Sequence, residues 1–184
     1  MYSDANKAYD IIDRKASSNV LIQGLSGIAG VPFTLFADVG TVFSHYGPMF
    51  NEIRAVYGHA PVDGSAISAF LSGCKQELVS DVVVDKVLGN IPLIGLPANM
   101  IAAKSMTWRT GIVVGMLSAR GEEINPENVK KATLPVRQMF PQRESLSFRK
   151  PTCKVVCKLP EAVEELSVEE MDDRVSKALD LIAS

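Results

Sequence analysis

The side chains best suited to acid–base chemistry lie on one predicted helix. Asp38 and His45 are seven residues apart, a spacing that places both on one helical face, and Thr41 lies between them. Such a group could transfer a proton, but a partly buried histidine paired with a helix neighbour gives the same pattern. Lys104 and Arg109 interrupt an apolar stretch further along the chain. They could contact lipid phosphates or Asp38, or they could form a solvated helix face.

Other signatures of catalysis or metal binding are incomplete. Cys153 and Cys157 are four residues apart rather than in a C-x-x-C pair, and neither histidine is close to them in sequence. Cys74 stands among leucines at helical spacing, so we expect it in the core. The stretch GLSG at 24–27 lacks the G-x-S-x-G pattern of a nucleophile elbow. We therefore expect a non-enzymatic protein that holds no metal and no cofactor.

Charge is unevenly distributed along a chain whose net charge is −2. Residues 126–158 carry eight basic and two acidic side chains, and residues 159–184 carry two basic and eight acidic ones. The candidates for contact with an anionic membrane or a partner are Lys130, Lys131, Arg137, Arg143, Arg149 and Lys150. Alternatively, the acidic tail neutralises these cations within the molecule, or masks them until a membrane or partner displaces it. The small net charge argues against nucleic-acid binding.

Helices must position these side chains. Apolar residues at spacings of three and four predict helices over about 4–30, 34–58, 63–89 and 98–120, and a fifth helix opening at Asn125-Pro126. Pro48 predicts a kink near Ser44 to Gly47. Apolar residues make up 47% of the 184 residues, which is enough to bury a core. The predicted fold class is all-α, a helical bundle of about five main helices.

Prolines break the two most apolar regions, GVPFTLFADV at 30–39 and IPLIGLPANM at 91–100. Pro32, Pro92 and Pro97 are the predicted corners of helical hairpins. The window 16–37 has no charged residue over 22 positions, close to the length of a membrane span. Its glycines, serines and proline make it a poor spanning helix, so we favour a buried hairpin.

The two halves of the predicted bundle share a plan. A shift of 63 residues places Gly58 on Gly121, and the helix caps Asp63 and Asn125 fall within one residue of each other. Each half contains a helix, a Gly/Pro break, a long helix, a glycine stop and a capped helix. This plan predicts two related hairpins, although unrelated bundles can have similar loops.

The C-terminal quarter has a different pattern. We predict a hairpin-repeat domain over 1–135, followed at 136–184 by a basic extended connector and an acidic C-terminal helix. The connector contains one short strand-like run, Lys154–Lys158. Ser167 and Glu170 form a capping box that opens the last helix. Its narrow heptad stripe must pack on the domain or on a partner, which could be a second copy of the chain.

Two stretches resemble known families. Residues 30–63 resemble the helical, membrane-associated domains attached to some Era-like GTPases, and the matching segment of immunity-related GTPases, through Pro32, Asp38 and Tyr57-Gly58. Residues 95–132 more closely resemble the EcsC family, through Leu96-Pro97-Ala98, Gly121, Glu122-Glu123 and Asn125-Pro126-Glu127. The resemblance covers roughly residues 16–132. It implies a helical fold at the cytoplasmic face of a membrane, with no established chemistry, and no G-x-x-x-x-G-K-[ST] loop is present for a GTPase.

These observations lead to one expected function and two alternatives. We expect a non-enzymatic EcsC-like module, cytoplasmic or peripheral at the cytoplasmic membrane, which associates with a lipid surface or binds a protein partner and could be regulatory. The main alternative is a membrane-inserting, pore-forming protein whose hairpins open into the bilayer. An enzyme that uses His45 and Asp38 is the third.

Overall fold

The computed structural model of this chain is built from helices. It describes residues 3–26, 39–74, 95–139 and 150–156, with side chains over 3–18, 44–74, 104–136 and 150–156. The helices are α1 (Asp4–Ser26), α3 (Val39–Val56), α5 (Gly95–Ala119) and α6 (Pro126–Met139). Residues 64–74 form a further helical segment and residues 153–156 a short helical turn, and no strand occurs within the described ranges. The predicted all-α fold class is confirmed.

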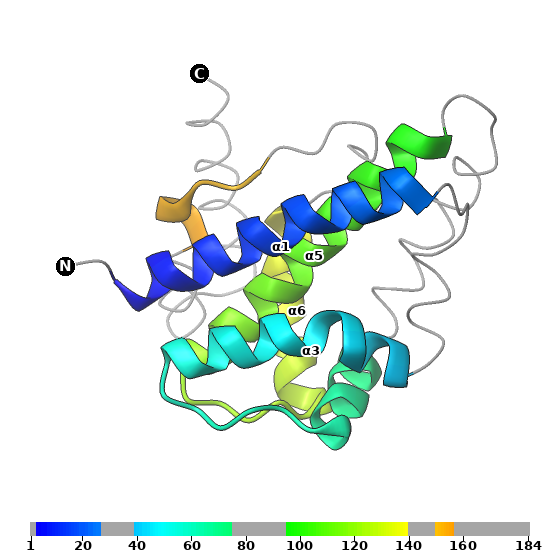
Figure 1. The fold of residues 1–184 in the computed structure, drawn as a ribbon. Coiled ribbons are helices and arrows are strands. Elements are labelled where there is room, and N and C mark those ends of the chain that lie inside the picture. Colours follow the sequence, from blue (N-terminus) through cyan, green and yellow to red (C-terminus); the bar gives the residue numbers. More distant parts are fainter. Residues whose placement is uncertain (1–2, 27–38, 75–94, 140–149, 157–184) are drawn as a thin grey trace.

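The central helix of the bundle is α5. It packs against α1, α3 and α6, and its pairing with α1 is the most extensive among the described helices. Figure 1 shows α1 along the front of α5, with α3 below and α6 behind. Every residue from 110 to 118 is buried, which is the pattern expected of a helix covered on all sides.

The α1–α5 contact explains why both helices have small residues at the interface. The buried side of α1 carries Ala8, Ile12 and Ala16, which the spacing of its apolar residues predicts, and also Tyr9. Opposite Ile12, a β-carbon on Gly111 would lie 2.6 Å from the Ile12 Cγ1 atom, so only glycine allows this close approach. The helix is described as far as Ser26, and the stop predicted near residue 30 lies outside the described residues.

In α3 the predicted wide apolar stripe faces the core. Tyr46, Met49, Phe50 and Ile53 are all buried, and the Phe50 ring packs edge-on against a phenylalanine of segment 64–74. The helix continues through Pro48, which is exposed. A proline on the solvent side is tolerated because water can reach the carbonyl that loses its helical N–H partner.

Two helix ends have the same turn geometry, 63 residues apart in sequence. Gly58 and Gly121 both have a positive φ, 77° and 68°. At the first turn, the Gly58 N–H donates to the Ala55 carbonyl and the next N–H donates to the Arg54 carbonyl. The second turn repeats both bonds, with Gly121 donating to Ser118 and the following N–H to Leu117. These paired bonds define a Schellman motif, in which glycine adopts the left-handed conformation without strain.

Each of these turns leads to an N-cap. The Asp63 carboxylate accepts the Ala66 N–H at 2.9 Å, and the Asn125 side-chain oxygen accepts the Asn128 N–H at 2.9 Å. The predicted stops at Gly58 and Gly121 and the predicted caps at Asp63 and Asn125 are therefore confirmed. The common origin of the two halves stays a prediction, since matching turns also occur in unrelated helical proteins.

The C-terminal part of the described structure differs from expectation in two places. Helix α6 continues past residue 135, where the sequence pattern weakens, and both Pro135 and Val136 are buried. The predicted strand-like run begins at Lys154, but residues 153–156 form a helical turn. The Val155 and Val156 N–H groups donate to the Thr152 carbonyl within the turn, and both side chains pack against the hydrophobic core. The remainder of the predicted connector and the predicted final helix lie outside the described residues.

In the part of the chain that the structure describes, none of the helices combines the length and the apolar character needed to cross a bilayer.

Candidate functional site

The described basic candidates fall into two groups on different helices. Lys130 and Lys131 lie on α6, and Lys150 lies against α1. Arg137 lies in the last turn of α6, where only its backbone is described. Arg143 and Arg149 lie outside the described residues. Lys150 forms an ion pair with Asp13 of α1, whereas α6 lies behind α5 in Figure 1.

The α6 outer face consists of Glu127, Lys130, Lys131 and Leu134, which follow one another at helical spacing and are all exposed. The Lys131 ammonium lies 2.8 Å from the Glu127 carboxylate. Their hydrogen bond raises the pKa of Lys131 and lowers the pKa of Glu127. Leu134 is 47% exposed, and it is the exposed large apolar side chain of the described structure. Cations around an exposed leucine are suited to contact with an anionic, partly apolar surface.

The predicted acid–base group is only partly described. Asp38 lies outside the described residues, and Thr41 has no described side chain. His45 is half-buried on α3, and its ring packs edge-on against Tyr46 with centroids 4.7 Å apart. Lys104 and Arg109 are half-buried on α5, and both interact with other groups.

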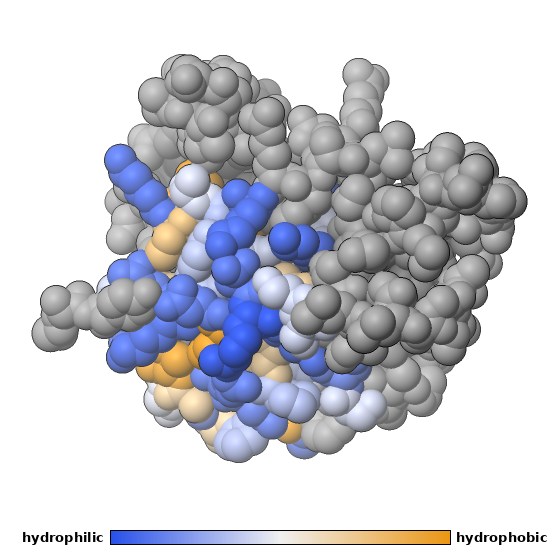
Figure 2. All heavy atoms as spheres, turned by 45° about the horizontal axis from the view of Figure 1, so that its top comes forward, coloured by the Kyte–Doolittle hydropathy of each residue, from blue (hydrophilic) through white to orange (hydrophobic). Residues whose placement is uncertain are grey.

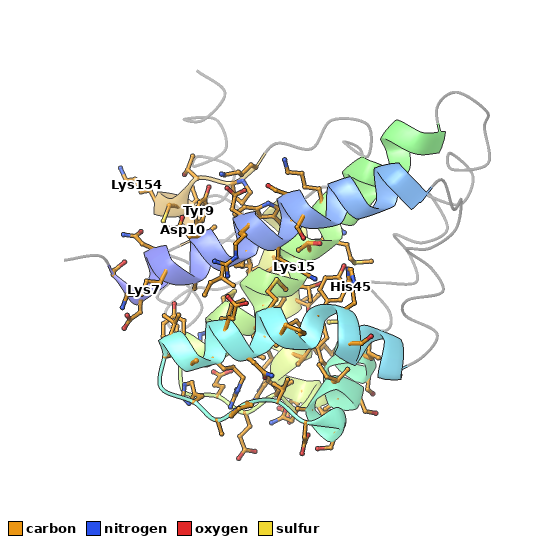
Figure 3. All side chains as sticks on the ribbon, in the orientation of Figure 1. Lys7, Tyr9, Asp10, Lys15, His45 and Lys154 are labelled. Carbon is orange, nitrogen blue, oxygen red and sulfur yellow. The ribbon has the colours of Figure 1, made fainter. Side chains whose placement is uncertain are left out.

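Lys15 is a neighbour of His45 that sequence reasoning missed. Figure 3 shows Lys15 of α1 and His45 of α3 in the space between the two helices. Burial, with a smaller effect from the Lys15 charge, lowers the pKa of His45 to about 4. Burial also lowers the pKa of Lys15, although Glu52 opposes the shift. His45 is therefore neutral near pH 7 and is poorly matched to proton transfer at that pH.

Tyr46 completes this polar layer at the junction of α1, α3 and α5. Its side chain is 2% exposed and hydrogen-bonds to the fully buried Thr107 of α5. Burial raises the pKa of Tyr46 to about 12 despite that bond. The phenol therefore stays protonated, and the pair joins α3 to α5 through a satisfied buried hydrogen bond.

A second cluster, also missed by sequence reasoning, joins residues 150–156 to α1. The Tyr9 hydroxyl donates to the Pro151 carbonyl at 2.8 Å, and Pro151 is buried. The Lys150 ammonium lies 2.6 Å from the Asp13 carboxylate. Further along the segment, the Cys153 thiol donates to the Asn6 side-chain oxygen at 2.7 Å. Figure 3 shows Tyr9 on α1 beneath this segment, and Figure 2 shows mostly hydrophilic residues on the coloured part of the face around it.

The two Schellman turns also lie side by side. The His59 ring contacts the Ser118 carbonyl at 2.8 Å, and because a carbonyl can only accept, the Nε2 atom must carry the proton. Beside this contact is an open groove of about 470 Å³, whose lining includes Arg54, Asp63 and Glu123. The Arg54 Nε atom donates to the Ala60 carbonyl, so this side chain braces the first turn.

The remaining predicted positions carry less structural information. Pro97 lies in the first turn of α5, where proline is tolerated, whereas Pro32 and Pro92 lie outside the described residues. Cys74 is buried, as expected of a core residue. Within the described ranges, no three His, Cys, Asp or Glu side chains form a group that could hold a metal ion.

Comparisons of the chain with models of protein families, with curated proteins and with solved structures found no significant match. The resemblance to EcsC proteins therefore stays a prediction from the motifs in the sequence.

Proposed function

We propose that this protein is a non-enzymatic helical module that attaches peripherally to an anionic membrane surface, and that the α6 outer face makes the contact. The observation that carries the proposal is the exposed Leu134 next to Lys130 and Lys131 on one helical face. An exposed leucine adds apolar contact, and the lysines add attraction to acidic headgroups. The EcsC-like motifs support a position at the cytoplasmic face of the membrane.

The expected attachment is weak and sensitive to salt. A cation close to an anionic surface changes the binding constant by about fivefold. Two lysines and one half-exposed leucine therefore support reversible association rather than firm anchoring, which takes a second signal. Raising the ionic strength shortens the screening length and should weaken the attachment.

Flotation with vesicles tests the proposal. The full chain should float with phosphatidylserine-containing vesicles in low salt and should not float with pure phosphatidylcholine vesicles. Lys130→Glu/Lys131→Glu should lower the binding constant by roughly 25-fold or more, because both charges reverse. The matched control is Lys7→Glu/Arg14→Glu on α1, which makes the same charge change at two exposed, ion-paired positions.

Three results decide between the proposal and its alternatives. Loss of flotation in the α6 variant but not in the α1 variant supports the α6 outer face. Equal loss in both variants shows that net charge matters rather than this face, and absence of flotation overturns the proposal. Release of a trapped dye from the vesicles would favour the pore-forming alternative.

A further inference from the structure

We propose that Tyr9, Asp13 and Trp108 form a binding site for a primary ammonium group, and that Lys150 fills this site from within the same chain. The site lies where α1 and α5 meet, under residues 150–156. Binding of the Lys150 ammonium group at this site keeps residues 150–156 docked on α1.

The site combines a carboxylate contact with two aromatic contacts. The Lys150 Nζ atom lies 2.6 Å from the Asp13 Oδ2 atom. It also lies over two aromatic rings, 5.3 Å from the Tyr9 centroid and 6.0 Å from the Trp108 centroid. A carboxylate and two ring faces attract the same positive charge from different directions.

The site is held in place by packing. The rings of Tyr9 and Trp108 lie 5.0 Å apart at an angle of 58°, and Trp108 is fully buried. The Tyr9 hydroxyl is also fixed by its hydrogen bond to the Pro151 carbonyl. Because α1 and α5 pack more extensively than the other described helix pairs, the two rings should keep their positions when Lys150 is removed.

The contacts favour a primary ammonium over other cations. The short hydrogen bond to Asp13 needs an N–H donor, which a quaternary ammonium lacks. The lysine side chain brings its ammonium to the site on a flexible alkyl stem, 40% exposed. A free alkylammonium has the same donors and charge, so it should enter the site when Lys150 is shortened.

Within the chain, the ammonium acts as a tether for residues 150–156. Its neighbour Pro151 is buried on α1, and Cys153 two residues further on contacts Asn6. These contacts follow Lys150 directly in sequence, so loss of the ammonium should weaken all of them together. Because Lys150 is attached to the same chain, its effective concentration at the site is far above that of a competing lysine in dilute solution.

The experiment uses the full chain and two readouts. Trp108 is the single tryptophan of the sequence, so its emission reports on this site alone. Trypsin cleavage after Lys154 reports on segment 150–156, because that bond is protected while the helical turn is docked. In Lys150→Ala and Asp13→Asn we expect a shift of tryptophan emission to longer wavelength and cleavage that is about fivefold faster or more.

Chemical rescue makes the test specific. Adding n-butylammonium to Lys150→Ala should reverse the emission shift, with half the effect at roughly 10–100 mM, since the free amine lacks the advantage of attachment. Tetramethylammonium at equal ionic strength should not reverse it, and neither amine should act on Lys150→Ala/Asp13→Asn. Lys150→Arg keeps the charge and should retain most of the protection, and Lys7→Ala on α1 serves as the surface control.

Circular dichroism of each variant shows that the bundle is folded before these readouts are compared. Emission and cleavage unchanged from the parent chain in Lys150→Ala would overturn the proposal. Rescue by tetramethylammonium as effective as rescue by n-butylammonium would also overturn it, because it would show that N–H donors are not recognised.

Discussion

Helical glycines provide a direct test of the packing in this bundle, because a methyl group added to each would meet different surroundings. At Gly73 a β-carbon would lie 2.6 Å from the Val129 β-carbon and 2.7 Å from the Pro126 carbonyl oxygen. At Gly115 it would meet no atom of the described residues within 4 Å. Alanine is favoured over glycine inside a helix by about 1 kcal/mol, and overpacking costs about 1–3 kcal/mol.

These magnitudes give opposite signs for the two substitutions. Gly73→Ala should lower the free energy of unfolding by about 2 kcal/mol, since the clash includes backbone that cannot rotate away. Gly115→Ala should raise it by about 1 kcal/mol through helix propensity alone. Gly111→Ala should fall between them, because its β-carbon would lie 2.6 Å from the Ile12 Cγ1 atom but would meet no backbone atom among its nearest contacts.

Urea unfolding followed by circular dichroism and by tryptophan emission measures all three changes. For a chain of this size, 2 kcal/mol corresponds to a melting temperature lower by about 4–8 °C. An unchanged or higher stability of Gly73→Ala would refute the close approach of segment 64–74 to α6. Equal effects at Gly73 and Gly115 would show that helix propensity, rather than packing, controls these positions.

Three further substitutions test the turns and the polar layer. Asn125→Ala removes the cap of α6 and should cost about 1 kcal/mol in urea unfolding, and Asn125→Asp should retain most of that stability. Tyr46→Phe leaves the buried Thr107 hydroxyl without its partner and should cost about 1–2 kcal/mol, whereas Tyr46→Phe/Thr107→Val should cost less than the sum of the two single changes. The pKa of His45 falls from 6.5 to about 4 on folding, so the unfolded chain takes up the proton first. The native state is therefore fully stable with respect to His45 above pH 6.5, and it loses about 2 kcal/mol, after allowance for solvent screening, as the pH falls through about 4. His45→Gln should flatten that part of the curve of urea midpoint against pH.

The features that could be predicted from sequence are those determined by short-range chemistry. Gly58 and Gly121 end their helices because the left-handed conformation there favours glycine. Asp63 and Asn125 cap the next helices because their side-chain oxygens reach an N–H three residues ahead. The apolar stripe of α1 is likewise visible in the spacing of its residues. Each of these signals is contained within a few neighbouring residues.

The features that could not be predicted depend on pairs remote in sequence. Tyr9 and Pro151 are separated by 142 positions, and Lys150 and Asp13 by 137. No periodic pattern marks these residues, since each is a single polar group on an otherwise ordinary helix or segment. The same reason applies to Lys15, whose influence on His45 depends on how α1 packs against α3. Helical period can indicate which face is buried but not which helix covers it.

The number of basic residues along the chain also overstates the net positive charge that the protein surface presents to a membrane. In the basic stretch 126–158, the described side chains include Lys131 and Lys150, and each has a carboxylate within hydrogen-bond distance. Glu127 and Lys131 form an ion pair on the α6 outer face, so a membrane that contacts this face meets a neutralised pair rather than a single cation. Lys130 has no such carboxylate among the described residues. We therefore expect Lys130→Glu to weaken flotation more than Lys131→Glu, and the reverse order would show that the Glu127 pair opens when α6 meets the membrane.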